Sequence, residues 1–396
     1  MWAGIGAIVS RCRAGAARQK VAELISDRFR ARGALLTDSG TSALRLAIAG
    51  AALSRPGAAA ALPAYCCYDL ATAADGAGVP VVLYDLDPAT LGPRQESLAR
   101  ALAHPISSLV VAHLYGHPVD VPACQRLADG AGALLIEDAA QGIGGRLGGQ
   151  DLGTFGSLSV LSLGRGKGWT GGAGGALVAH DDRGAAVVAW AGTTLGNGGR
   201  GWGDLARLTA QAALGRPGVY GIPASLPFLH LGETIYHRPH EPWGASDASM
   251  AAALENWALL ERETSVRRAA AERWGKSASE GGAGRRRMAE GGGGRWRAIR
   301  APGGSEPGYL RFPVMAVDED RARFQAAGRL GVAPGYPRAL CDLPGFGERV
   351  LNRDEDFGGA RELAARLFTL PTHSRLSEGD LRELERYQGT SEPVLR

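Results

Sequence analysis

One lysine of this chain lies where an amine could do covalent chemistry. Only three of the 44 basic side chains are lysines, and Lys167 follows an apolar run in the glycine-rich stretch LSLGRGKGWTGG (161–172). An amine can attack a carbonyl carbon, which a guanidinium cannot do. The stretch is not a Walker loop, because Leu161 and Gly168 replace that motif's first glycine and its Ser/Thr. The sequence therefore favours Lys167 as a nucleophile, with a solvated loop lysine as the alternative.

An earlier motif, DSGTSAL (38–44), has the composition of an anion-binding helix start. A small polar turn opens a helix directly after an expected strand. The free N–H groups and the positive end of the helix dipole there suit a phosphate. The alternative is that Ser39 or Thr41 merely caps the helix.

A third motif, LIEDAAQ (135–141), places an acid at the end of an apolar strand. Asp138 is expected at the carboxyl edge of a sheet, where open α/β folds bind their ligands. A carboxylate at that edge can pair with a protonated ring nitrogen. The alternative is again a helix cap.

The elements that must position these motifs alternate between apolar runs and helical stretches over the first 180 residues. Such alternation predicts an α/β fold with a mainly parallel sheet and helices on both faces. The expected strands are 34–36, 59–62, 80–86, 108–114, 133–137, 157–163 and 175–179, and the expected helices are 41–52, 70–77 and 121–131.

The second half of the chain predicts a smaller C-terminal α/β domain. The expected division is a large domain over 1–240, with an irregular crossover segment at 194–243, and a small domain over 241–396. The stretch EGGAGRRRMAEGGGGR (280–295) is low in complexity and is expected to be a flexible loop. The other expected elements are helices at 248–274, 318–330 and 377–388 and strands at 309–314 and 367–371.

Composition narrows the function classes. The 396 residues are 45% hydrophobic, which is typical of a globular chain of about two domains. The net charge of +4 is scattered, so nothing indicates a nucleic-acid partner. The five cysteines are odd in number and lack a CxxC, which argues against a disulfide framework or a metal site and favours a reducing cytoplasm. We expect neither a membrane span nor an export signal.

Taken in order, GTSAL, EDAAQ, SLGRGK and GGAGGALV resemble the motifs of the DegT/StrS family of sugar aminotransferases. Asp138 and Lys167 are 29 positions apart, which is the family's spacing from acid to lysine. The likeness extends over about 35–384 and is weakest in 194–243. Each motif alone is weak, whereas the ordered set is specific. Other similar segments are Leu62–Tyr65, His113–Gly116, Gly153–Gly156 and Leu367–His373.

The resemblance implies a pyridoxal 5'-phosphate enzyme of the aspartate-aminotransferase fold (fold type I), with a role for each matching residue. Lys167 would hold the cofactor as an internal aldimine and then move a proton as base and acid. Asp138 would keep the ring nitrogen protonated, so that the ring accepts electrons. Gln141 would lie against the cofactor ring or hydrogen-bond to it. The implied residues around the cofactor phosphate are Gly40, Thr41, Ser42 and Ser162.

The sequence departs from the family at two places. The aromatic residue that stacks on the cofactor falls on Cys67, and we favour Tyr68 in its place, with Tyr65 as the alternative and simple packing as a third reading. The Asn-x-Arg element that reaches the neighbouring subunit is replaced by EPWGAS (241–246). The candidates to substitute for it are His237, Arg238 and His240, just before this stretch. The position two after Gln141, often His in the family, is Ile143. These changes indicate a divergent acceptor site.

The implied function is an aminotransferase, acting as a homodimer in the cytoplasm. It would move an amino group from glutamate or glutamine to a keto sugar, and we expect that sugar to be linked to a nucleotide. A dehydratase of the same fold carries His in place of the lysine, so Lys167 argues against it. A non-catalytic relative that senses or binds is a further alternative. No GxGxxG follows an early strand, which sets a Rossmann dehydrogenase aside.

Overall fold

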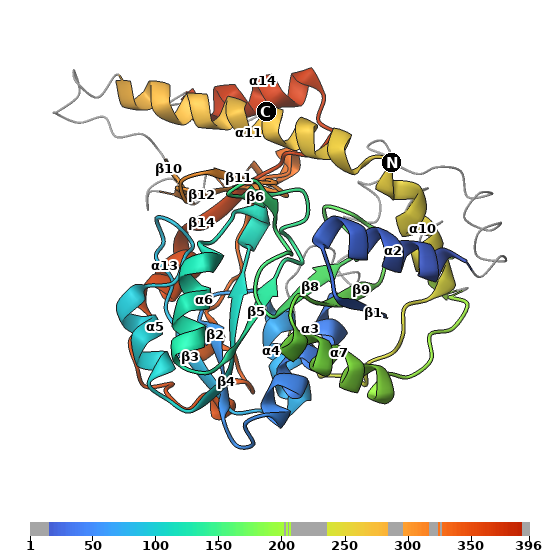
Figure 1. Cartoon of the computed structure of the whole chain (residues 1–396). Coiled ribbons are helices and arrows are strands. Elements are labelled where there is room, and N and C mark those ends of the chain that lie inside the picture. Colours follow the sequence, from blue (N-terminus) through green and yellow to red (C-terminus); the bar gives the residue numbers. More distant parts are fainter. Residues whose placement is uncertain are drawn as a thin grey trace.

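A seven-stranded sheet forms the centre of the larger part of the molecule (Figure 1). The computed structural model describes residues 16–201, 203–204, 206, 236–283, 296–316, 324 and 327–389. The strand order is β1-β9-β8-β5-β4-β2-β3, and only β9 runs antiparallel to both of its neighbours. The predicted mainly parallel sheet is thereby confirmed. The strands are β1 (Gly33–Thr37), β2 (Ala59–Pro63), β3 (Val81–Tyr84), β4 (Ile106–Ala112), β5 (Leu134–Asp138), β8 (Leu158–Ser162) and β9 (Gly175–Ala179).

Helices cover the sheet and join its strands, and several begin at a side-chain cap. Ser39, Asp120, Asp181 and Ser246 each accept a hydrogen bond from the backbone N–H three residues on. The helices are α2 (Ala17–Phe29), α3 (Gly40–Leu53), α4 (Tyr68–Ala77), α5 (Gln95–Leu102), α6 (Val121–Gly130), α7 (Asp182–Thr194), α10 (Asp247–Trp257), α11 (Leu260–Ala283), α13 (Gly358–Arg366) and α14 (Glu378–Gly389), with 3₁₀ turns at Leu114–Gly116, Ala327–Leu330, Leu340–Asp342 and Gly347–Arg349.

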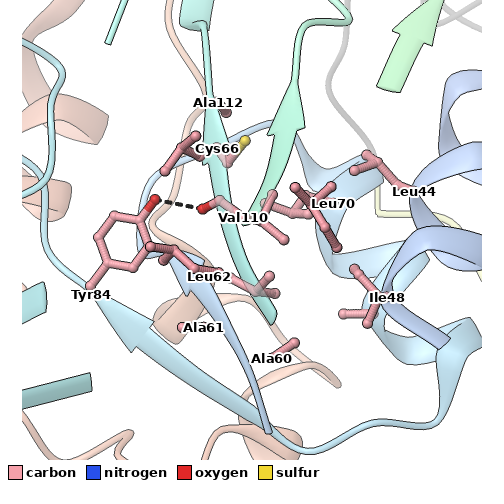
Figure 2. Close-up of a cluster of buried hydrophobic side chains, with 14 of the residues drawn as sticks. Leu44, Ile48, Ala60, Ala61, Leu62, Cys66, Leu70, Tyr84, Val110 and Ala112 are labelled. Atoms are coloured by element: carbon pink, nitrogen blue, oxygen red, sulfur yellow. Dashed lines mark hydrogen bonds between the residues drawn. The ribbon is translucent and has the colours of Figure 1, made fainter. Parts of the chain in front are cut away.

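Strand alternation divides the core around the sheet into two clusters. In β8 and β9, Val160 and Leu177 belong to the cluster that includes α3 and α4, while Leu161 and Val178 belong to the cluster that includes α2 and α10. Figure 2 shows part of the first cluster, in which side chains of β2 meet Leu44 and Ile48 of α3. The sheet is therefore buried on both faces at its centre.

A segment late in the chain returns to this first core. Buried side chains of residues 336–363, the returning C-terminal segment, pack into it, among them Phe346 and Phe357. Asp85 follows β3 and accepts hydrogen bonds from the backbone N–H groups of Gly359 and Ala360 at the start of α13, at 2.9 and 2.7 Å. Asn352 bonds both the N–H and the C=O of Leu83, at 2.9 and 3.0 Å, and so occupies the outer edge of β3.

A second sheet, in the order β10-β12-β14-β13, packs under α11 and α14 (Figure 1). Its core contains Trp274, Val314 and Phe368, all buried. A small three-stranded sheet, β11-β6-β7, joins this region to the loop after β5. The remaining strands are β6 (Arg146–Leu147), β7 (Gln150–Asp151), β10 (Trp296–Ala298), β11 (Ser305–Glu306), β12 (Phe312–Ala316), β13 (Ala333–Pro334) and β14 (Leu367–Leu370).

Three sequence expectations need correction in this half. The single helix over 248–274 is two helices, α10 and α11, separated at residues 258–259. The loop placed at 280–295 starts later, because α11 continues to Ala283. The strand placed at 309–314 starts at Phe312, since Tyr309 has a φ of 43°, a left-handed conformation that no strand residue adopts.

Parts of three expected elements lie outside the described residues. These are most of the irregular segment 194–243, the rest of the loop at 280–295, and most of the helix at 318–330. The start of the irregular segment is helical, because α7 ends at Thr194. The division into domains at residue 240 stays a prediction.

Candidate active site

The parallel strands bring the three motifs to one edge of the main sheet. The carboxyl ends of β1, β5 and β8 lead into Asp38, Asp138 and Ser162, respectively. Because these strands run in the same direction, their carboxyl ends meet at the same edge. The structure therefore gathers residues that lie more than 120 positions apart in sequence.

The first turn of α3 and the end of β8 form a tight cradle. A Cβ atom added to Gly40 would lie 2.9 Å from Ser162 Cβ and 3.2 Å from its Oγ, so only glycine fits there. Ser39 caps the helix by accepting a hydrogen bond from Ser42 N at 3.1 Å. The cap reading is thus confirmed for Ser39. Thr41 is half-buried in the same first turn of α3, beside the backbone N–H groups of the helix N-terminus.

Asp138 is a buried carboxylate with little support from this chain. Its side chain accepts one hydrogen bond, from Ala140 N to Oδ1 at 3.0 Å, and within the described residues Oδ2 makes none. Burial raises the pKa of Asp138 above its ordinary value of 3.8, and the positive charge of Lys167 opposes that rise in part. A cation or an N–H donor bonded to Oδ2 would therefore stabilise the ionised form of this carboxylate and lower its pKa.

Lys167 lies half-buried in a turn that is held at its far end by α10. Gly166 has a φ of 71°, and a Cβ on Gly168 would lie 2.6 Å from the carbonyl oxygen of Ile143. These two glycines let the chain bend sharply and pass close to the loop after β5. Burial raises the pKa of the Cys66 and Cys67 thiols, and the positive charge of Lys167 opposes that rise in part.

The anchor on α10 uses two buried hydrogen bonds. The indole nitrogen of Trp169 donates to Ala253 O at 2.7 Å, and the amide of Asn256 donates to Thr170 O at 2.9 Å. The ring of Trp169 also meets Trp257 edge-on, with centroids 4.7 Å apart. These contacts attach the backbone that follows Lys167 to α10.

Gln141 has both ends of its amide engaged. Oε1 accepts a hydrogen bond from Tyr115 N at 2.8 Å, and Nε2 donates to the Tyr336 hydroxyl at 2.7 Å. The amide is thereby held over the same sheet edge as Asp138, three residues earlier. Sequence reasoning missed both partners of Gln141.

The two tyrosines considered for stacking both contact Tyr336. Tyr65 is fully buried, and its hydroxyl accepts from Tyr336 N at 2.8 Å and lies 3.3 Å from that of Tyr115. Tyr68 is the first residue of α4, and its ring centroid lies 6.4 Å from that of Tyr336. The predicted site residues thus lie at one edge of the sheet.

A buried acid beside Asp138 also escaped the sequence reasoning. Glu137 has no exposed surface, and it accepts hydrogen bonds from Gly153 N and Phe155 N and pairs with His113 Nε2 at 2.8 Å. Val119 N donates to His113 Nδ1 at 3.2 Å, so the ring proton is on Nε2 and points at Glu137. The sequence did contain a signal for this pair, because an acidic side chain that follows an apolar, buried run must have a partner.

The residues present fit a phosphorylated ring with a protonated nitrogen. The Gly40–Ser162 cradle and the start of α3 suit the phosphate. The carboxylate of Asp138, whose Oδ2 has no hydrogen bond from the described residues, suits the ring nitrogen, and the positive charge of Lys167 acts on the same carboxylate. Within the described ranges, no group of three or more metal-ligating side chains occurs and no helix has the length and apolarity of a membrane span.

Comparisons with known proteins point the same way. Residues 9–201 match the model of the DegT/DnrJ/EryC1/StrS aminotransferase family. Over 165 residues the chain is 31% identical to an L-glutamine:2-deoxy-scyllo-inosose aminotransferase of Streptomyces kanamyceticus, covering 42% of this chain and 38% of that protein. Over 133 residues it is 38% identical to a dTDP-3-amino-3,4,6-trideoxy-alpha-D-glucose transaminase of Streptomyces venezuelae, covering 33% of this chain and 34% of that protein. The matched part is therefore under two fifths of the length of these relatives.

The structural matches extend further than the sequence matches. A DegT DnrJ EryC1 StrS aminotransferase from Brucella abortus superposes with a TM-score of 0.73 at 19% identity, covering 97% of this chain and 95% of that one. NtdA of Bacillus subtilis, solved with bound cofactor PMP, gives a TM-score of 0.71 at 15% identity and covers 98% and 84%. The predicted fold class is confirmed by these matches.

Proposed function

We propose that this chain, which over residues 9–201 belongs to the DegT/DnrJ/EryC1/StrS aminotransferase family, is a pyridoxal 5'-phosphate-dependent aminotransferase. The observation that carries the proposal is the meeting of Lys167, Asp138 and the Gly40–Ser162 cradle at one sheet edge. When bound, the cofactor supplies an electron sink for the negative charge left when an amino acid loses its α-proton.

The chain's own groups then have separable tasks. Lys167 holds the cofactor covalently through Nζ and afterwards moves the substrate proton, because it is the amine on the glycine-rich turn. Asp138 offers its free Oδ2 to the ring nitrogen and keeps that nitrogen protonated. Gln141 lies against the ring, and Gly40, Thr41, Ser42 and Ser162 bind the phosphate.

The proposed substrates are glutamate or glutamine as amino donor and a keto sugar, nucleotide-linked, as acceptor. The names of two relatives support this class, because one is an L-glutamine:2-deoxy-scyllo-inosose aminotransferase and the other is a transaminase of a dTDP-linked amino sugar. Tyr68 is proposed to stack on the ring, although both it and Tyr65 are buried. We also propose that the chain forms a homodimer, as the family resemblance implies. The cysteine pattern supports a cytoplasmic location.

The test is the visible absorbance of the purified protein, before and after an amino donor is added. We expect a yellow band that bleaches with glutamate or glutamine and returns when a keto-sugar acceptor is supplied. A band that no donor bleaches would refute the transaminase, and no band after addition of pyridoxal phosphate would refute the cofactor.

A matched pair of lysine variants tests the role of Lys167. Lys167→Arg keeps the charge but removes the nucleophilic amine, and we expect turnover to fall by about 10²–10⁴-fold or more, the usual share of one proton-transfer group. Lys20→Arg is the control, because Lys20 is exposed and pairs with the exposed Glu23 at 3.2 Å. Wild-type turnover in Lys167→Arg would contradict the mechanism.

A further inference from the structure

Tyr336 lies in the cofactor site although it comes from the returning C-terminal segment. Its hydroxyl accepts a hydrogen bond from Gln141 Nε2 at 2.7 Å, and its side chain is buried. The orientation of the Gln141 amide follows from the hydrogen bond at its oxygen atom. Tyr115 N can only donate, so Gln141 Oε1 must face it and Nε2 must face Tyr336.

The ring of Tyr336 has little freedom to move. Its centroid lies 5.5 Å from that of Tyr65, 6.4 Å from that of Tyr68 and 5.7 Å from that of Tyr115, which stacks at an interplanar angle of 21°. Its backbone N–H donates to the Tyr65 hydroxyl, and a Cβ on Gly335 would lie 2.2 Å from that same oxygen. A side chain at 335 would therefore push the segment off Tyr65.

The Tyr336 hydroxyl keeps its own hydrogen available. The oxygen already accepts from Gln141, and within the described residues its hydrogen has no acceptor. Burial raises the pKa of Tyr336 well above 10, so the group stays a neutral phenol at physiological pH. The hydroxyl is therefore a fixed acceptor for Gln141 and has no role as a base.

We propose that Tyr336 is a positioning residue of the cofactor site, which fixes the Gln141 carboxamide against the cofactor ring and so links the returning C-terminal segment to cofactor binding. This inference rests on the proposed function, because Gln141 is assigned to the ring there. Because the amide is already held in one orientation, cofactor binding does not lose the conformational entropy of a free glutamine side chain.

The experiment measures pyridoxal phosphate affinity of the cofactor-free full chain, by titration of the visible band, in Tyr336→Phe, Gln141→Leu and the double variant. We expect Tyr336→Phe to weaken affinity about five-fold, as the loss of one net hydrogen bond does. The double variant should bind as weakly as Gln141→Leu alone, because the two residues act through one hydrogen bond.

Tyr84→Phe is the matched control. Tyr84 is equally buried in the first core, and its hydroxyl donates to Val110 O at 2.7 Å, as Figure 2 shows. We expect this variant to lower the melting temperature while leaving pyridoxal phosphate affinity unchanged. Unchanged affinity in Tyr336→Phe, or losses that multiply in the double variant, would overturn the inference while leaving the proposed function intact. Failure of the wild-type chain to bind pyridoxal phosphate would instead overturn the proposed function, and the inference with it.

Discussion

At the scale of single residues, Asp138 carries a conflict between stability and binding. The cofactor-free fold buries this carboxylate and gives it one hydrogen bond, so burial raises its pKa. The folded state then holds the Asp138 proton more tightly than the unfolded chain does. The free energy of unfolding therefore falls as the pH rises from 3.8 through the raised value, and the penalty persists above it.

Asp138→Asn should remove this pH dependence from the cofactor-free protein. We expect the variant to be as stable as the wild type near pH 3, where both side chains are neutral, and more stable than it at pH 7. Its affinity for pyridoxal phosphate should fall, because the neutral amide cannot hold the ring nitrogen protonated. Urea unfolding across pH and a cofactor titration measure the two effects. Asp27→Asn, at an exposed position, is the control, and a wild-type pH profile in Asp138→Asn would refute the account.

The buried Glu137–His113 pair makes a second prediction at this scale. Glu137→Ala leaves His113 Nε2, Gly153 N and Phe155 N without their acceptor. We expect the free energy of unfolding to fall by about 3–5 kcal/mol, as when one member of a buried pair is removed. Glu23→Ala, on an exposed helix face, should change it by less than about 0.5 kcal/mol. A loss below about 1 kcal/mol in a urea titration of Glu137→Ala would show that the pair does not hold these loops.

At the scale of elements, α10 determines where Lys167 lies. Asn256→Ala removes the donor to Thr170 O, which is buried beneath the lysine turn. A carbonyl left without a partner costs about 1–3 kcal/mol, and we expect that loss in the free energy of unfolding. Because the turn is loosened, pyridoxal phosphate should also bind more weakly. Gln125→Ala, at the surface of α6, is the control; full cofactor affinity in Asn256→Ala would show that the anchor does not reach Lys167.

The sequence predicted the central elements well because their local signals agree. The predicted bounds of β9 match the observed ones, and the short apolar runs of β2 and β5 are buried strands, as their alternation with helices predicted. It missed α2, although Val21, Ile25 and Phe29 recur every four residues and are all buried. It joined α10 to α11, since apolar spacing continues across the break. Tyr115 and Tyr336, the two partners of Gln141, come from distant segments of the chain. They could not be predicted from the sequence, because tertiary packing alone brings them next to Gln141.

At the scale of the whole molecule, the returning segment makes the two ends of the chain interdependent. Phe346 is fully buried in the core of the large sheet, whereas nearby Leu351 is 61% exposed. We expect Phe346→Ala to lower the free energy of unfolding by about 3–5 kcal/mol and to lower the protection of β2 and β3 amides from hydrogen exchange. Leu351→Ala should change neither by much. Undiminished protection of those amides in Phe346→Ala would mean that the large sheet is independent of the returning segment.

Because the returning C-terminal segment is made late, the N-terminal core stays incomplete during most of translation. Asn352 covers the outer edge of β3, and Asp85 has its partners in α13. While the ribosome is still making the middle of the chain, that strand edge and the apolar face beneath Phe346 remain uncovered. A bare edge and an open apolar surface are the features that promote association between nascent chains. All strands of the large sheet lie within residues 33–179, but the core packed against it is completed only when residues 336–363 emerge near the end of translation, and we expect the newly made N-terminal half to expose this surface until then.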